Sequence, residues 1–168
     1  MRTRHIPLGT GIYYPAEAAS LLGLPAYKVQ RWANGYTFWA PGHSTRSHSA
    51  PVIKPDLPRI GRARALSFLE LMELRVVGKL RERGLSLQYI RSAAQLARRT
   101  FGTTHPFATR KVYTDGKAIF AGLTPDPDDS DMVELVRNKH AQVIFGSVFQ
   151  PFLDDMGFDP VSGLARRW

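Results

Sequence analysis

The sequence predicts an α+β fold in two parts, a helical domain over residues 1–103 and a small α/β domain over residues 104–168. Apolar residues recur at helical spacing between Tyr14 and Phe101, in segments bounded by glycine, proline and capping residues. Beyond His105, β-rich runs flank an Asp-Gly pair, a strong hairpin signal because both central turn residues need positive φ. We therefore expect long helices in the first part and a β-hairpin in the second.

Residues 14–36 predict two short helices joined by a tight turn. Pro15 suits the first helical position, and Gly23 can take the positive φ of a helix C-cap. The second helix begins at Pro25 and is expected to present these side chains outward: Tyr27, Lys28, Gln30 and Arg31. Such a pair describes a helix-turn-helix, whose second helix can enter the DNA major groove. The alternative is an αα-hairpin inside a helical core, with ordinary solvated charges.

A wing is expected directly after the second helix. Residues 36–39 are rich in β-formers, residues 40–50 form a polar loop, and residues 51–53 are a second apolar run. Two strands linked by a cationic loop make a wing, which lies along phosphates or reaches the minor groove. The wing candidates are Arg46, His48 and Lys54. The alternative is a disordered loop with incidental charge. Residues 57–64 are expected to form a basic connector that could also touch phosphates.

Two long helices follow the connector. Ser67 and Glu70 have the spacing of a capping box, and the first helix is expected over residues 66–83. It is apolar around most of its circumference and needs cover on several sides, which makes it our candidate surface for a homodimer. Ser86 is expected to cap the second helix, residues 87–101. The arginines expected on its solvated face are Arg91, Arg98 and Arg99.

The C-terminal part has β character. Residues 111–114 and 117–120 are predicted to pair as strands across the turn at Asp115 and Gly116. An amphipathic helix is expected over residues 143–155, with a kink or break at Pro151.

The net charge of +9 is unevenly spread. Residues 1–64 carry nine Lys/Arg against two Asp/Glu, residues 65–123 carry ten against four, and residues 124–168 carry four against eight. The basic segments, residues 1–123, suit a polyanion, because phosphate contacts dominate non-specific affinity for nucleic acid. The acidic segment, residues 124–168, suits a different partner.

Several classes of protein are not expected. The absence of cysteine removes disulfides, thiolate zinc sites and cysteine nucleophiles. No stretch approaches the roughly 18 apolar residues of a membrane span, and no signal peptide is recognisable, so we expect a cytoplasmic protein with no membrane partner. The five histidines lack metal-site spacing, and neither a phosphate loop nor a nucleophile elbow is present. We expect no cofactor, no metal and no enzymatic activity.

Two blocks of sequence resemble known families. Residues 14–36, the basic loop and residues 73–93 resemble the MerR-type winged-helix DNA-binding domain, in which a Gly-x-Ser-Leu-x-x-Ile turn joins two helices, as in Gly84–Ile90. Residues 105–120 with residues 158–168 are similar to VapB-type bacterial antitoxins, which couple a MerR-like N-terminal domain to a small α/β extension.

The resemblance implies the antitoxin of a type II toxin–antitoxin system, which represses its own operon and neutralises a PIN-like ribonuclease toxin. The implied partners are double-stranded operator DNA, a second copy of the chain and the cognate toxin. Such proteins commonly continue past the Ala-Arg-Arg-Trp segment, and toxin binding would then belong to that further part. Taken together, the predicted DNA-binding residues are Tyr27, Lys28, Gln30, Arg31, Tyr36, Arg46, His48 and Lys54.

Two other functions remain open. One is a MerR-like transcriptional regulator whose C-terminal domain senses a small apolar molecule, in a pocket lined by Phe107, Tyr113, Phe120 and Phe145. The other is an interaction module without a DNA partner, whose basic face docks acidic protein or RNA.

Overall fold

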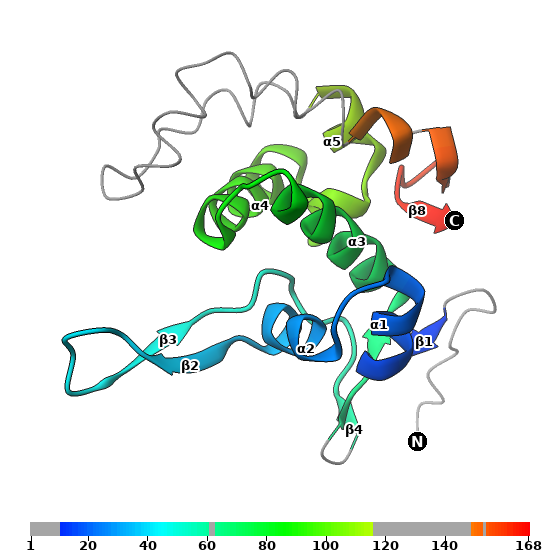
Figure 1. Ribbon diagram of the computed structural model, residues 1–168. Helices are drawn as coiled ribbons and strands as arrows, with labels where there is room; N and C mark the ends of the chain where they lie inside the picture. The colour runs from blue at the N-terminus through cyan, green and yellow to red at the C-terminus, as the bar shows by residue number, and fades with distance from the viewer. Residues whose placement is uncertain (1–10, 61–62, 116–148, 153) are drawn as a thin grey trace, which may run out of the picture.

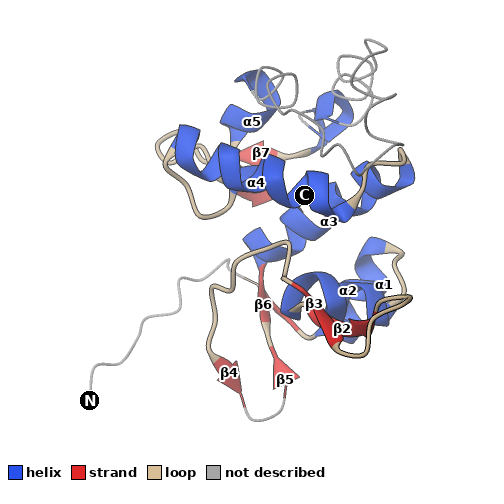
Figure 2. Ribbon diagram, turned by 90° about the vertical axis from the view of Figure 1, so that its left-hand side faces the viewer, coloured by secondary structure: helices blue, strands red, loops and turns tan. Residues whose placement is uncertain are grey.

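One long helix, α3 (Phe68–Glu82), runs through the middle of the molecule. The computed structural model describes residues 11–60, 63–115, 149–152 and 154–168. The other helices are α1 (Pro15–Leu22), α2 (Ala26–Asn34), α4 (Leu87–Phe101), the 3-10 helix η1 (Pro106–Ala108) and α5 (Arg110–Asp115). The pair α1 and α2 lies on one side of α3, and α4 and α5 lie on the other side (Figure 1 and Figure 2).

The strands are short and pair two by two. Within the described residues they form four antiparallel ladders: β1 (Ile12–Tyr13) with β6 (Leu66–Ser67), β2 (Tyr36–Trp39) with β3 (Arg46–Ser49), β4 (Arg59–Ile60) with β5 (Ala63–Arg64), and β7 (Gly157–Phe158) with β8 (Ala165–Arg167). This mixture of helices and small antiparallel sheets confirms the predicted α+β class.

The helix pair forms as its sequence pattern predicts. The Tyr14 backbone N–H donates to the Glu17 carboxylate over 2.8 Å at the start of α1, and Gly23 closes that helix at a φ of +63°. Ala18 and Val29 are fully buried in the core that the pair shares with α3. Burial of these two faces leaves the opposite face of α2 open to solvent.

The hairpin after α2 ends earlier in the sequence than predicted. Its first strand, β2, matches the predicted residues 36–39, but the second strand is β3, inside the segment expected to be the loop. The prediction of a strand at residues 51–53 is wrong. Pro51 has no N–H for a ladder, and the side chains of Val52 and Ile53 are only 1% and 2% exposed because they fill the core.

The predicted basic connector over residues 57–64 contains the small β4–β5 ladder. Arg64 is buried, pairs with the fully buried Glu70, and donates to the backbone oxygen of Ala33 at the end of α2. This arginine therefore ties α2 to α3 and is not available to phosphates, whereas phosphate contact by the rest of the connector stays a prediction.

The capping box at the start of α3 is confirmed. The Ser67 hydroxyl accepts from the Glu70 backbone N–H over 3.2 Å, and the Glu70 carboxylate accepts from the Ser67 N–H over 2.9 Å. The apolar circumference of α3 is covered by α1, α2, α4, η1 and β8 of the same chain. The argument that made residues 66–83 a dimer surface therefore fails, and the homodimer itself stays a prediction.

The first predicted strand of the C-terminal hairpin is helical. Residues 110–115 form α5, in which Val112 and Tyr113 are buried. The Tyr113 hydroxyl donates to the Phe107 oxygen over 2.7 Å, and its ring meets Phe149 edge-on at 5.4 Å. These tertiary contacts outweigh the β propensity of the segment. The predicted strand at residues 117–120 lies outside the described residues, as does Gly116.

The predicted helix over residues 143–155 is described only in its last part. Residues 149–152 and 154–155 are helical, and the Met156 N–H donates to the Phe152 oxygen over 2.9 Å. Pro151 lies within the helical residues 149–152, and the kink or break expected there stays a prediction because the preceding residues lie outside the described part. Residues 143–148 and 153 lie outside the described part of the chain.

Three ionisable groups form a network, in which His105 and Glu73 are buried and Asp56 is exposed. His105 Nδ1 lies 3.1 Å from Glu73 Oε2, and His105 Nε2 lies 2.7 Å from Asp56 Oδ1. Burial favours the neutral ring, but Glu73 and Asp56 outweigh it and raise the pKa of His105 above its ordinary 6.5. Burial raises the pKa of Glu73, although His105 and Arg98 oppose this. The network joins the segment after the hairpin to α3 and η1.

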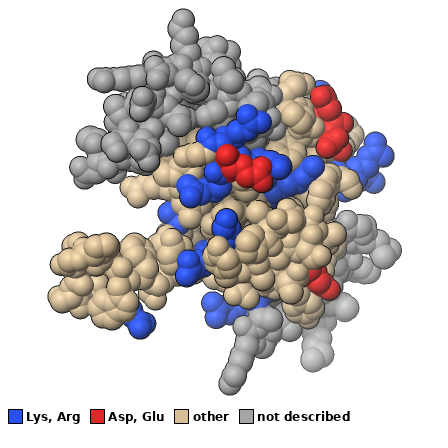
Figure 3. Space-filling model, viewed as in Figure 1, with Lys and Arg blue, Asp and Glu red and all other residues tan. Residues whose placement is uncertain are grey.

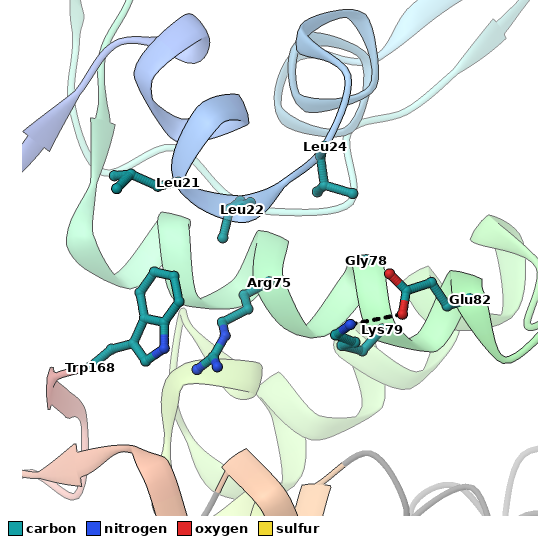
Figure 4. Close-up of a pocket in the computed structure, with 8 residues that line it drawn as sticks. All are labelled: Leu21, Leu22, Leu24, Arg75, Gly78, Lys79, Glu82 and Trp168. Atoms are coloured by element: carbon teal, nitrogen blue, oxygen red, sulfur yellow. Dashed lines mark hydrogen bonds and ion pairs between the residues drawn. The ribbon is translucent and has the colours of Figure 1, made fainter.

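Trp168, the residue after β8, lines a small pocket together with Leu21, Leu22 and Leu24. Figure 4 shows Leu21 and Leu22 above α3, with Trp168 and Arg75 below them. The Arg75 guanidinium carbon lies 4.2 Å from the centre of the Trp168 ring, and the pocket has a volume of about 60 Å³, enough for about two waters. A single cluster of buried side chains continues from α1 to β8. The division into domains at residues 103 and 104 stays a prediction.

Candidate nucleic-acid interface

The outer face of α2 carries the four side chains that the sequence predicts there. Tyr27, Gln30 and Arg31 are exposed, and Lys28 is half-buried. The Arg31 guanidinium carbon lies 5.5 Å from the centre of the Tyr27 ring and 4.8 Å from that of Tyr36. Tyr27 and Arg31 are neighbours on the helix because they are four residues apart. Two tyrosines thus hold one arginine at the junction between α2 and β2.

The register of the hairpin sorts its side chains onto two faces. Trp39 lies opposite Arg46, and Thr37 lies opposite His48. Directly opposed residues of an antiparallel pair share a face, and residues two apart in a strand share it too. These four exposed residues form what we call the outer hairpin face: Thr37, Trp39, Arg46 and His48. The Arg46 guanidinium carbon lies 5.5 Å from the centre of the Trp39 ring.

The base of the hairpin is tied to α4 by arginine. Arg91 donates from Nε to the Ala50 oxygen over 2.8 Å and from Nη2 to the Ser49 hydroxyl over 2.6 Å. Arg98 donates to the Val52 oxygen over 3.1 Å. The expectation that these two arginines belong to a solvated face is wrong, because both bind the chain that leaves β3. Arg99 is exposed, as expected.

The base is also tied to α2. The Val52 N–H donates to the Trp32 oxygen over 2.8 Å. Gly35, between α2 and β2, has a φ of +73°, and a Cβ at this position would lie 2.6 Å from the Ser49 oxygen. Only glycine fits both the conformation and the space. The hairpin therefore leaves α2 in a direction that the local backbone sets, and it projects away from the helices (Figure 1).

Lys54 lies beyond the hairpin, because β3 ends at Ser49. Its side chain is exposed and follows the two buried residues Val52 and Ile53. The interpretation of Lys54 as a wing residue is wrong in position. Arg46 and His48 lie on the hairpin as predicted, on β3 rather than in a loop.

This part of the molecule carries no negative charge. The sequence has no Asp or Glu between Glu17 and Asp56, a stretch that contains α2 and the whole hairpin. Figure 3 shows no red atoms on the projecting hairpin in that view. A surface of cations and aromatic rings without carboxylates is suited to a polyanion.

Sequence reasoning missed three residues at this surface. Trp39 and Phe38 are 61% and 41% exposed, although they had been assigned only as β-formers, and Arg91 positions the hairpin. Proline is accepted at the first residue of a strand, so Pro51 gave no reason to move the second strand to residues 46–49. No local signal marked the pairing of Trp39 with Arg46, and none marks Arg91.

Other kinds of site find little support. Among the described residues no group of three or more His, Cys, Asp or Glu could hold a metal ion. No helix in the described ranges is both long and apolar enough to cross a membrane. Phe107 and Tyr113, two of the four residues suggested for a small-molecule pocket, are buried and in contact with the core. Phe120 and Phe145 lie outside the described residues.

Comparison with known proteins supports the helix-turn-helix. No curated protein sequence matches the chain. The X-ray crystal structure of Rv2018 from Mycobacterium tuberculosis is similar in fold, with a TM-score of 0.59 and 19% sequence identity. The match covers 91% of this chain and 66% of Rv2018, so the chain spans just under two thirds of that protein's length. A family model described as "Putative DNA-binding HTH domain" matches residues 11–94, half of the 168 residues. The chain therefore belongs to this helix-turn-helix DNA-binding family.

Proposed function

We propose that the protein is a transcriptional repressor that reads operator DNA with α2 as its recognition helix and the β2–β3 hairpin as a MerR-like wing. One observation carries the proposal: Arg31 is exposed on α2 and held between Tyr27 and Tyr36. Arginine binds guanine O6 and N7 through two parallel hydrogen bonds, the commonest specific contact in the major groove. A guanidinium already stacked on rings loses less freedom when it makes such a pair.

The order of the elements supports a MerR-like arrangement. A helix pair, a hairpin and a long helix follow one another, and the turn from α3 to α4 passes through Gly84 at a φ of +89°. The Ser86 hydroxyl then caps α4 by accepting from the Tyr89 N–H over 3.1 Å. These residues belong to the Gly-x-Ser-Leu-x-x-Ile segment on which the resemblance rests.

The DNA-binding test begins with selection of duplexes from a random library by the full chain. We expect enrichment of a two-fold symmetric sequence, because a homodimer would present two copies of α2 to half-sites about one helical turn apart. Light scattering on the free protein measures the dimer directly. A library that shows no enrichment after repeated rounds would contradict DNA reading, and a single asymmetric half-site with a monomeric protein would contradict the dimer alone.

We further propose that the repressor is an antitoxin that neutralises a PIN-like ribonuclease. Support comes from the resemblance of residues 105–120 and 158–168 to VapB-type proteins and from the separation of charge along the chain. The basic N-terminal part would face DNA, and the acidic C-terminal part would face a protein. Such a protein works in the cytoplasm, without a cofactor and without catalysis of its own.

The toxin is sought in the adjacent reading frame. A small PIN-like nuclease gene beside or overlapping this one, whose product co-purifies after co-expression, is the expected result. Growth arrest by the neighbouring protein should be relieved by this chain. A neighbour that neither arrests growth nor binds the chain would reject the antitoxin role and leave the repressor role standing.

The small-molecule sensor is the less supported alternative. A cavity of about 550 Å³ beside β7 and β8 is within the usual range of about 300–1,000 Å³ for ligand pockets, but its described lining is Gly157, Phe158, Arg166 and Arg167, and neither Phe107 nor Tyr113 is part of it. The pocket between α1, α3 and Trp168 has only about 60 Å³. The Tyr113 ring is packed against Phe149 and Phe158. We therefore favour a protein partner for the C-terminal part.

A further inference from the structure

Asp56 is the first carboxylate after a long stretch that contains α2 and the hairpin, since the sequence has no Asp or Glu between Glu17 and Asp56. Two exposed cations flank it, Lys54 and Arg59. Lys54 is two residues away, and two residues of chain span at most about 7 Å. This distance is within the screening length of about 8 Å at physiological salt. The charge of Asp56 would therefore repel a phosphate bound by Lys54.

The segment around Asp56 lies in the part of the molecule that is proposed to bind DNA. Arg59 begins the β4–β5 ladder, and both views place this ladder on the same side of α3 as α1 and α2 (Figure 1 and Figure 2). Arg64, in β5, donates to Ala33 at the end of α2. A change in the charge of this segment is therefore a change in the proposed DNA-binding part.

Two side chains hold the Asp56 carboxylate against the body of the protein. His105 Nε2 lies 2.7 Å from Asp56 Oδ1, and the Ser67 hydroxyl donates to Asp56 Oδ2 over 2.6 Å. Ser67 is the N-cap of α3, and His105 directly precedes η1. Each carboxylate oxygen is thus bound by a group of the protein.

His105 needs its proton to serve both of its partners. Its Nδ1 lies 3.1 Å from Glu73 Oε2, and its side chain is only 3% exposed. The protonated ring has an N–H on each nitrogen and can donate to Glu73 and Asp56 together, whereas the neutral ring has a single N–H. After loss of the proton, one ring nitrogen faces a carboxylate oxygen without a hydrogen between them. Glu73 is fully buried and Asp56 is exposed, so Asp56 is the carboxylate that can turn away.

The other charged and titratable groups near the ring keep their states around neutral pH or share its proton. Arg98, on α4, interacts with the Glu73 carboxylate and stays charged. Burial raises the pKa of Tyr113, on α5, so its hydroxyl stays neutral. Burial also raises the pKa of Glu73, which shares the proton with the ring. The His105–Glu73 pair therefore becomes negative when one proton leaves, and it then no longer compensates Asp56.

We infer that His105 is a positioning residue for DNA binding, whose protonated ring holds Asp56 inward and compensates its charge so that Lys54 and Arg59 meet phosphates. Loss of the proton frees the carboxylate and places an uncompensated negative charge beside the DNA. The inference rests on the proposed DNA-binding function and deepens it, because it makes DNA affinity depend on pH through a residue that does not touch DNA.

The direction of this dependence follows from linkage. In the free protein, Glu73 and Asp56 raise the pKa of His105 above its ordinary 6.5. DNA is a polyanion and favours the protonated ring, so the pKa of His105 is higher still in the complex. The affinity is therefore greatest below the pKa of the free protein and falls as the pH rises through the pKa of the complex.

The experiment measures affinity for a duplex selected by the full chain, by fluorescence anisotropy at fixed salt from pH 6 to pH 9. Wild-type affinity should fall at least fivefold more over this range than that of His105→Gln. The exposed His43 and His48 also lose protons, but both proteins contain them, so the comparison removes their contribution. Chemical denaturation at each pH verifies that the proteins are folded.

Asp56→Asn separates compensation of charge from a merely structural role. The amide keeps an oxygen for His105 and a polar group for Ser67 but has no charge. At pH 9 this variant should bind at least fivefold more tightly than the wild type, and the gain should shrink below twofold at pH 6. In the Asp56→Asn background, His105→Gln should cost less than twofold.

The matched control is Glu82→Gln, which removes an exposed carboxylate at the other end of α3, about 20 Å of helix away from Ser67. It should keep the pH dependence of the wild type. An equal gain in Glu82→Gln at pH 9 would show that only net charge matters and would overturn the inference.

Two further results overturn it. One is the same pH dependence in the wild type and His105→Gln, and the other is an Asp56→Asn protein that gains no affinity at pH 9. If His105→Gln does not fold, the Asp56→Asn comparison decides alone. Failure of the proposed function is separate, because the initial selection would then enrich no duplex.

Discussion

The Arg31 guanidinium contacts the rings of two tyrosines from different elements, Tyr27 on α2 and Tyr36 on β2. Each cation–π contact at an exposed site contributes about 0.5–1 kcal/mol. Because Arg31 bridges the helix and the first residue of the hairpin, these rings orient the side chain that is proposed to read a base.

Removing one ring should weaken DNA binding through Arg31. We expect Tyr36→Ala to reduce the free energy of binding to the selected duplex by about 0.5–1 kcal/mol. In an Arg31→Ala background the same substitution should have a smaller effect, which a double-mutant cycle measures. Equal effects in both backgrounds would mean that Tyr36 acts independently of the arginine.

His105 should make stability depend on pH. Its folded-state pKa is raised above 6.5 by Glu73 and Asp56, so its contribution is full below about pH 6.5 and is lost as the pH rises through the folded-state pKa. The pKa of Glu73 is also raised, and Arg98 faces the same carboxylate. Both shifts therefore make the free energy of unfolding fall as the pH rises.

The comparison is His105→Gln against the wild type, by chemical denaturation from pH 6 to pH 9. The variant should be less stable at pH 6, and the difference should shrink with pH at no more than about 1.4 kcal/mol per unit. A difference that stays constant across this range would show that the ring acts only through packing.

At the scale of elements, the hairpin is positioned by hydrogen bonds at its base. Arg91 contacts Ser49 and Ala50, and Val52 is bonded to both Arg98 and the end of α2. The long helix α4 thereby sets the direction in which the hairpin leaves the body, although it is distant in sequence.

Arg91→Ala should free the hairpin without unfolding the protein. We expect affinity for the selected duplex to fall by about 1–2 kcal/mol, because the hairpin must then be ordered on binding. The melting temperature should change little, since Arg91 is half-buried at the edge of the core. Arg99→Ala, an exposed arginine on the same helix, is the matched control and should bind like the wild type.

The elements also show what a sequence can and cannot predict. The helices α1 to α4 were predicted because their signals are local: apolar spacing, Gly23 as a C-cap and the Ser67–Glu70 box. The strand β3 was misplaced because Arg-Ser-His-Ser carries no apolar alternation. The helix α5 was missed because contacts with Phe107 and Phe149 override the β propensity of its residues. Arg91 binds 41 residues away, at Ala50, which no local pattern reveals.

At the scale of the whole molecule, the distribution of charged residues agrees with the proposed DNA-binding function. The segment that contains α2 and the hairpin has no Asp or Glu, whereas Glu70 and Glu73 are buried in the interior. Binding of DNA by such a surface releases counterions, so affinity should fall steeply with salt.

The dependence of DNA affinity on salt tests whether Lys54 contacts DNA. It is exposed but lies outside the hairpin, so we expect it to contact a phosphate rather than a base. Lys54→Ala should weaken binding to all duplexes alike and reduce the slope of log K against log salt by about 1. An unchanged slope would remove Lys54 from the DNA surface.

The central claim is that α2 reads DNA through Arg31, and one titration tests it most directly. The full chain, Arg31→Ala and the control Arg166→Ala, an exposed arginine on β8, are titrated against the selected duplex at one salt concentration. Arg31→Ala should lose about 1–3 kcal/mol of binding free energy and tolerate replacement of the guanine that it reads. Arg166→Ala should match the wild type. Wild-type affinity and unchanged base preference in the Arg31→Ala protein would contradict the claim.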